Sequence, residues 1–136
     1  MNRTFFVPTV LVLVFVLAFA SLAHSRAVPI QQYGHSGLSA TYGKLTADQV
    51  DNAIMRAGLA KGWQMHKLSP GMIAGTLVVR NHSVTVHISY TNDGYSIKYH
   101  DSVNMKARGG MIHSSYNRWV EDLNRRIVTE IGQMKR

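Results

Sequence analysis

The fold is decided by two neighbouring stretches that read VTVHISY over residues 84–90 and YSIKYH over residues 95–100. In both stretches, bulky apolar side chains alternate with polar ones, which is the two-residue period of a strand with one buried face. The connecting residues 91–94 end in an Asp-Gly pair, which favours a two-residue hairpin turn. The pattern therefore predicts an antiparallel hairpin in which Tyr90 lies opposite Ile97.

Two more strands are predicted upstream of this hairpin. Residues 63–69 and 72–80 are rich in apolar side chains and are separated by a Pro-Gly turn. A two-residue turn over residues 81–82 places Leu77 opposite Val86 and keeps the apolar side chains on one face. We therefore expect a four-stranded antiparallel meander with one apolar face.

Two amphipathic helices flank the predicted meander. The first begins at Thr46, because Thr46 and Gln49 have the spacing of a capping box and an apolar stripe follows them. The second begins at Ser114 or Ser115 and has a continuous apolar stripe down one side. Both helices can bury their stripes on the apolar face of the sheet. The sequence thus predicts one α+β domain over residues 45–136, with the element order α-β-β-β-β-α.

The beginning of the chain resembles an export signal. Residues 1–23 have the pattern of a secretory leader, in which Arg3 precedes an uncharged apolar run, and small residues favour cleavage before His24. The alternative is an uncleaved membrane anchor, which also leaves the rest of the chain outside the cytoplasm. The polar, glycine-containing residues 24–44 predict a flexible arm between the leader and the domain.

The charge and the cysteine content restrict the cellular location and the kinds of partner that we expect. The chain has no cysteine, which excludes disulfides, zinc–thiolate sites and the lipid attachment of a bacterial lipoprotein. Without Arg3 of the leader, 14 of the 15 basic side chains remain against 7 acidic ones, a net charge of +7. We therefore expect a periplasmic protein that is not integral to the membrane after leader cleavage. Its expected partner is an envelope protein or an anionic envelope component.

Histidines suggest an alternative function in metal binding. In the predicted hairpin, His87 and His100 face each other on the polar side, where two imidazoles can bind Zn²⁺ or Cu²⁺. No third ligand lies beside them, so the sequence favours a protein without a cofactor. Catalytic motifs are absent from the sequence, which makes an enzyme the less favoured alternative. Nucleic acid is not expected as a partner, because the aromatic side chains fall on the buried face.

Two surfaces are candidate binding sites. The first is the junction between the last strand and the last helix, where folding should gather polar side chains that either cap the helix or form the rim of a small polar ligand site. The second is the basic outer face of the last helix. The residues concerned are Asp101, Asn104, His113, Tyr116 and Asn117 at the junction, and Arg125 and Arg126 on the helix.

The same region resembles a known family. The string I-K-Y-x-D-S-x-N-M, followed after a gap by I-H-x-x-Y-N-R-W-V, is similar to a motif of small, uncharacterised bacterial envelope proteins, many of them lipoproteins. The resemblance extends over roughly residues 45–131. It implies an envelope location and an α+β outline, and it implies no activity. This chain differs from the lipoprotein members, because it lacks the lipid-bearing cysteine.

Overall fold

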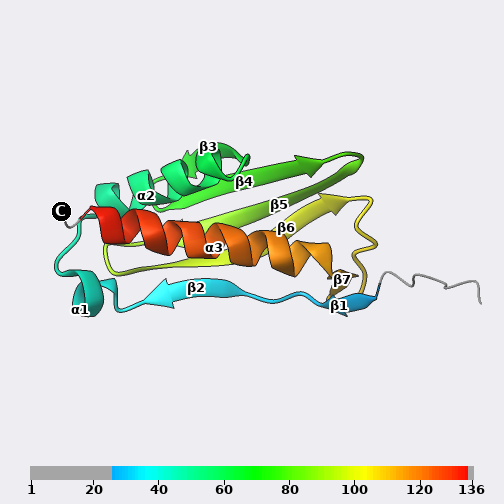
Figure 1. The fold of residues 1–136 in the computed structure, drawn as a ribbon, viewed down its shortest axis with the longest axis horizontal. Helices are drawn as coiled ribbons and strands as arrows, with labels where there is room; N and C mark the ends of the chain where they lie inside the picture. Colours follow the sequence, from blue (N-terminus) through cyan, green and yellow to red (C-terminus); the bar gives the residue numbers. More distant parts are fainter. Residues whose placement is uncertain (1–25, 135–136) are drawn as a thin grey trace, which may run out of the picture.

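The computed structural model describes residues 26–134, so the predicted leader lies outside the described residues. The described chain is α+β, as the sequence predicts (Figure 1). Along the chain, the elements are β1 (Ala27–Pro29), β2 (Tyr33–Ser36), α1 (Leu38–Tyr42), α2 (Ala47–Ala60), β3 (Gln64–Ser69), β4 (Met72–Val79), β5 (His82–Tyr90), β6 (Gly94–Val103), β7 (Met111–His113) and α3 (Ser115–Gln133). None of the described helices is both long enough and apolar enough to cross a bilayer.

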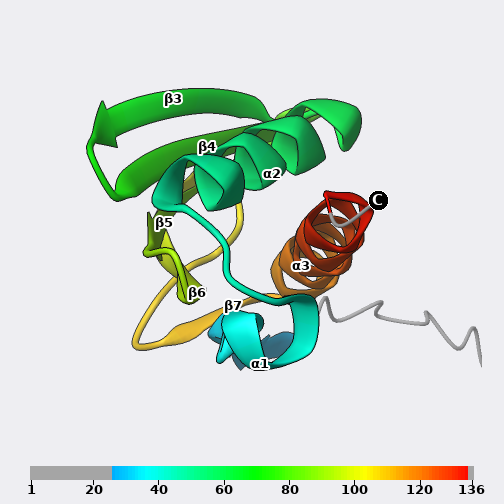
Figure 2. The same cartoon turned by 90° about the vertical axis from the view of Figure 1, so that its left-hand side faces the viewer.

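The main sheet has five strands in the order β2-β6-β5-β4-β3, and every neighbouring pair is antiparallel. Strands β3 to β6 form a meander of four strands, and β2 extends it at the β6 edge. A separate two-stranded sheet joins β1 to β7. Both α2 and α3 lie on the concave side of the curved sheet, as the end-on view in Figure 2 shows. The expected layout of four strands and two helices is therefore incomplete, because it lacks β1, β2, β7 and α1.

The segment predicted as a flexible arm is ordered from Ala27 onward, which corrects that prediction for the described part of residues 24–44. The prediction took glycine as a sign of mobility, whereas Gly34 is a site of close backbone contact. A Cβ atom on Gly34 would lie 2.5 Å from the carbonyl oxygen of Tyr95 on β6. Helix α1 is fixed as well, because the Asp93 carboxylate accepts the backbone N–H of Ser39 at 2.8 Å. The hydrogen bonds from Ser39 hold the pKa of Asp93 below its ordinary value.

The capping box at the start of α2 is confirmed. The Thr46 hydroxyl accepts the backbone N–H of Gln49 at 3.1 Å, and the Gln49 side chain accepts the backbone N–H of Thr46 at 2.9 Å. These two bonds satisfy amides that the first turn of a helix leaves unpaired.

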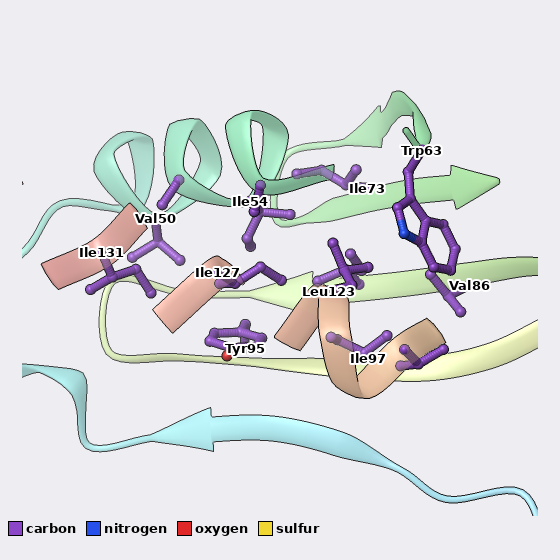
Figure 3. Packing of buried hydrophobic residues seen from close by; sticks show 14 of the residues in the cluster. Val50, Ile54, Trp63, Ile73, Val86, Tyr95, Ile97, Leu123, Ile127 and Ile131 are labelled. Atoms are coloured by element: carbon purple, nitrogen blue, oxygen red, sulfur yellow. The ribbon is translucent and has the colours of Figure 1, made fainter. Parts of the chain in front are cut away.

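The core lies between the helices and the concave face of the sheet. Figure 3 shows Ile54 of α2 and Ile127 of α3 pointing toward one another above this face. Apolar residues that are almost completely buried come from both helices, from the middle strands and, for Trp63, from the connection between α2 and β3. They include Val50, Ala53, Ile54, Trp63, Ile73, Val86, Ile88, Ile97, Tyr116, Leu123, Ile127 and Ile131.

Both predicted hairpin registers are wrong by two residues. Leu77 lies opposite Val84 instead of Val86, because the turn occupies residues 80–81. Tyr90 lies opposite Tyr95 instead of Ile97. A shift of two residues leaves every side chain on the same face of the sheet, so the apolar pattern cannot distinguish the two registers.

Candidate functional site

The polar residues expected at the junction do not form one cluster. Asp101 is exposed on β6, and its carboxylate accepts the backbone N–H of Ser102 at 2.8 Å. Asn117 lies on α3, where its side chain donates to the carbonyl oxygen of Pro29 at 2.9 Å and accepts the N–H of Gln31 at 3.0 Å. Asn117 therefore fixes the connection between β1 and β2 to the helix, and Asp101 belongs to the surface of the sheet.

Tyr116 lies inside the core and cannot line an exposed rim. Its side chain is fully buried, and its ring packs edge-on against Tyr99 with the centroids 5.5 Å apart. Burial raises the pKa of the Tyr116 phenol above its ordinary value, and the nearby tyrosines add to the effect. The hydroxyl finds no hydrogen-bond partner within residues 26–134.

The basic outer face of α3 is occupied by ion pairs within the helix. Arg126 Nε donates to Glu130 Oε1 at 3.0 Å, and the Glu130 side chain is almost fully buried. Arg125 lies between two carboxylates, 3.7 Å from Glu121 and 3.6 Å from Asp122. Both arginine charges are therefore partly neutralised before any ligand arrives.

The two remaining junction residues, Asn104 and His113, meet at a third residue, His82. The imidazoles of His82 and His113 lie with their ring centroids 6.4 Å apart. They line a pocket of about 250 Å³, which has room for about eight water molecules at roughly 30 Å³ each. We call it the His82–His113 pocket. Its lining residues are Val79, Arg80, His82, Met105, His113, Ser115 and Trp119.

Backbone hydrogen bonds fix the proton positions on both imidazoles. A carbonyl oxygen only accepts, so His82 Nδ1 must be protonated to donate to the carbonyl oxygen of Asn104 at 2.7 Å. The backbone N–H of Ser115 donates to His113 Nδ1 at 3.1 Å, so this nitrogen is unprotonated and the proton of His113 lies on Nε2. In the described part of the chain, neither Nε2 atom has a hydrogen-bond partner. The pocket thus offers a donor on His113 and, on neutral His82, an acceptor.

Backbone strain is concentrated around this pocket. In residues 26–134, three residues other than glycine have positive φ: Arg80 at 56°, Asn104 at 57° and Lys106 at 52°. Arg80 lines the pocket, Asn104 holds His82, and Lys106 follows the lining residue Met105. Such conformations are disfavoured by about 1 kcal/mol or more for side chains like these, and they are concentrated at functional sites.

Basic residues without an ion pair lie on the chain segments at the pocket's end of the molecule, and one of them, Arg80, lines the pocket. The turn after β4, the loop after β6, the β1–β7 sheet and the start of α3 lie at one end of the molecule (Figure 1). Basic residues on these segments have no carboxylate at ion-pair distance in the described structure. We call this region the basic end, and its residues are Arg26, Arg80, Lys106, Arg108 and Arg118.

A larger hollow of about 450 Å³ lies between the start of α2 and the turn after β3. Its polar centre is the buried carboxylate of Asp51, which accepts the phenol O–H of Tyr90 at 2.7 Å and lies 3.0 Å from Lys67 Nζ. The hydrogen bonds to Asp51 raise the pKa of both Tyr90 and Lys67. Tyr90 donates a hydrogen bond to Oδ2, and Lys67 forms an ion pair with Oδ1, which has no other hydrogen-bond partner in the described structure. Because the protein's own phenol and ammonium already occupy both oxygens, we interpret the group as a link between α2 and the sheet.

The candidate metal ligands do meet, but as stacked rings. His87 and His100 have their ring centroids 3.8 Å apart at an interplanar angle of 13°. A metal ion binds in the plane of an imidazole at about 2.0–2.1 Å, and parallel rings do not direct their lone pairs at a common point. Within the described residues, no group of three or more His, Cys, Asp or Glu side chains is arranged to hold a metal. The stack as it lies is therefore not a chelating geometry.

The stack gives a testable pH effect. Desolvation, followed by the nearby His100, lowers the pKa of His87 below its ordinary value of 6.5. The neutral form is thus favoured by the fold. Its contribution to stability is full above about pH 6.5 and is lost as the pH falls through the lowered pKa. We expect His100→Asn to move the pKa of His87 upward but not completely to 6.5, measured from the imidazole proton resonances. A matched change at exposed His35 should leave it unaltered, and an unaltered pKa in His100→Asn would contradict the assignment.

His82 is the site residue that sequence analysis missed, although the signal was present. His82 is separated by an even number of residues from Val84, Val86 and Ile88, whose side chains face the helices, so in a strand it lies on the same face. The predicted turn placed His82 in a loop and removed it from this alternation. With the turn at residues 80–81, His82 becomes the first residue of β5 and faces the helix side of the sheet.

The chain matches no protein-family model, no curated protein and no solved structure. The functional argument therefore depends on the geometry of the molecule itself.

Proposed function

We propose that this protein is a small exported binding module of the bacterial envelope, and that it binds an anionic group in the His82–His113 pocket. The observation that carries the proposal is the composition of the pocket lining. Arg80, His82 and His113 line it together with the indole of Trp119, and no carboxylate does. A compact anion can take hydrogen bonds from the Arg80 guanidinium and from His113 Nε2–H, and charge-assisted bonds of this kind are the stronger ones.

The surroundings of the pocket support an anionic ligand over a cationic one. Four of the seven carboxylates are held in ion pairs, and those four lie on α2 and α3. The basic end, at which the pocket lies, keeps its charges unpaired. Clustered charge of one sign attracts oppositely charged ligands and raises their rate of association.

The chemistry of the pocket supports binding rather than catalysis. The nucleophilic side chain in its lining is Ser115, which is buried and whose Oγ accepts a hydrogen bond from Arg118 at 3.2 Å. While the Ser115 N–H donates to Nδ1 of His113, the imidazole proton lies on Nε2. His113 therefore cannot act as a general base through Nε2. A non-enzymatic role therefore fits this arrangement better than hydrolysis does.

The location is part of the same proposal. The leader pattern of residues 1–23 supports export to the periplasm, and the absence of cysteine supports a protein without a lipid anchor. The intact mass of the protein purified from the cell envelope tests this proposal, since cleavage predicts a chain that begins at His24.

Titration with inorganic phosphate tests the pocket. We expect amide and indole resonances of the lining residues, including that of Trp119, to shift and saturate. His113→Ala removes a donor to a charged group, a loss of about 1.5–3 kcal/mol, so the affinity should fall roughly tenfold or more. His35→Ala, on exposed β2, is the matched control and should bind phosphate as the unmodified chain does.

A second pair of variants separates this pocket from the outer face of α3. Because Arg125 and Arg126 are already ion-paired, the double change Arg125→Glu/Arg126→Glu should leave phosphate binding nearly unaltered. If this pair abolishes binding and His113→Ala does not, the helix face is the site and the pocket assignment is wrong. Tight stoichiometric Zn²⁺ or Cu²⁺ binding that His87→Ala abolishes would instead favour the metal-binding alternative.

A further inference from the structure

The basic end carries exposed apolar side chains as well as unpaired charge. In residues 26–134, five large apolar side chains are well exposed, and three of them lie at this end: Val78 at 58 %, Val103 at 60 % and Met111 at 37 %. Val78 and Val103 flank Ser83 in one cross-strand row on the outer face of the sheet, directly before the β4–β5 turn and the loop after β6. Apolar side chains among unpaired basic ones are the combination that binds the surface of an anionic bilayer.

We propose that the basic end docks on an anionic lipid bilayer, with a headgroup phosphate in the His82–His113 pocket. This inference rests on the proposed function and names the source of its anion. Arg80, Lys106 and Arg108 would lie at the headgroup phosphates, and Met111, Val78 and Val103 would enter the boundary between headgroups and acyl chains.

Unpaired basic charge is most concentrated at this end, since three further basic residues without an ion pair in the described structure, Lys44, Arg56 and Lys98, lie elsewhere. The basic end has five basic residues in the described structure. The carboxylate of Asp101 lies on the outer face of the sheet, and those of Glu121 and Asp122, one turn along α3 from Arg118, are ion-paired with Arg125 and Lys61. At other places, basic side chains such as Arg125 and Arg126 have carboxylate partners. An anionic surface would therefore orient the molecule with the basic end toward it.

The order of the chain agrees with this orientation. Strand β1 belongs to the basic end and begins at Ala27, and the predicted cleavage site lies before His24. Three residues separate the two points, and they can span about 10 Å. A leader that is still uncleaved would bring the basic end within that distance of the bilayer, which makes docking an intramolecular event.

The inference is tested with the chain that begins at His24. It retains every described element and lacks the apolar leader, which would enter a bilayer by itself. Vesicles of phosphatidylcholine mixed with phosphatidylglycerol should sediment with the protein, added salt should weaken the binding, and pure phosphatidylcholine should not bind. Each basic side chain near an anionic surface contributes roughly fivefold, so Lys106→Gln/Arg108→Gln should lower the partition coefficient roughly 25-fold.

The control pair is Lys44→Gln/Arg56→Gln, which removes the same charge from exposed positions outside the basic end. It should have a much smaller effect. Equal losses in the two pairs would mean that net charge alone attracts the protein, and they would overturn the docking orientation. Binding to neither kind of vesicle, or equally to both, would also overturn it.

Quenching of tryptophan fluorescence distinguishes docking at the pocket from a nonspecific attraction of charge. Trp119 lines the pocket and Trp63 is 3 % exposed in the core. Brominated phosphatidylglycerol vesicles should quench the emission, and Trp119→Phe should remove the quenching. If inorganic phosphate binds in the pocket but vesicles do not, the docking inference is wrong and the proposed function stands. If phosphate does not bind while the vesicles bind through Lys106 and Arg108, the pocket is wrong and the docking surface stands.

Discussion

Replacing Gly34 by alanine is expected to lower the free energy of unfolding by about 1–3 kcal/mol, the range for inserting atoms into a well-packed site. The added Cβ would lie 2.5 Å from the Tyr95 carbonyl oxygen and 3.1 Å from the Ser96 Cα atom. Both obstacles belong to the backbone of β6, so neither can rotate away. Strand β2 must then separate from β6 or both strands must bend. Urea denaturation measures the loss.

Hydrogen exchange would locate the effect. Tyr33 lies opposite Ile97 and His35 opposite Tyr95, so a separated β2 exposes the amides at this edge. Their protection should fall, and that of the β4–β5 pair should persist. Uniform loss of protection across the whole sheet would show that β2 is inseparable from the meander.

Gly132→Ala is the matched control for the chemical change. Gly132 lies near the end of α3, and its added Cβ would meet Tyr42 at 3.7 Å, an ordinary contact. Because alanine is the better helix former by up to about 1 kcal/mol, this variant should be slightly stabilised. The same substitution is thus expected to lower the free energy of unfolding at Gly34 and to raise it at Gly132. A destabilised Gly132→Ala would show that backbone contact is not what distinguishes Gly34.

Local patterns in the sequence predict the parts of the fold that depend on neighbours in the chain. The capping box at Thr46 and the alternation of β5 each involve residues a few positions apart, and both are confirmed. Strand β2 depends on a partner some sixty residues away, and its sequence of Tyr33-Gly34-His35-Ser36 has no apolar face to signal it. Its signal is the glycine that permits close contact, and this looks the same in a sequence as a glycine in a mobile loop.

The candidate site was only half predictable for a related reason. Asn104 and His113 belong to segments whose proximity follows from the connection between strand and helix. His82 joins them only in the correct register of the β4–β5 hairpin, which two-residue slips leave undetermined. A different feature misplaced Asp101. The β5–β6 register shifts by one residue between Thr85 and Val86, a bulge that strict alternation does not reveal, so Asp101 lies opposite Thr85 on the outer face of the sheet.

Truncating Ile127 to alanine is expected to lower the free energy of unfolding by about 2–5 kcal/mol. Ile127 is fully buried on α3, and it faces Ile54 of α2 above the sheet (Figure 3). Ile54→Ala should be destabilising to a similar extent. If the two side chains support each other, the double variant should lose less than the sum of the two changes, with a coupling of about 0.5–3 kcal/mol. Thermal or urea unfolding of the four proteins measures it.

Leu59→Ala is the control for this cycle, because Leu59 also lies on α2 but is 63 % exposed. Its effect should stay within about 0.5 kcal/mol. The cycle also tests the independence of the site from the core. Ile127 lies eight residues beyond Trp119 on α3, about 12 Å along the helix, so Ile127→Ala should keep its phosphate affinity wherever the protein remains folded. If Ile127→Ala lowers the phosphate affinity as well as the free energy of unfolding, the His82–His113 pocket depends on the packing of the whole helix. In that case His113→Ala would no longer report on the ligand contact alone.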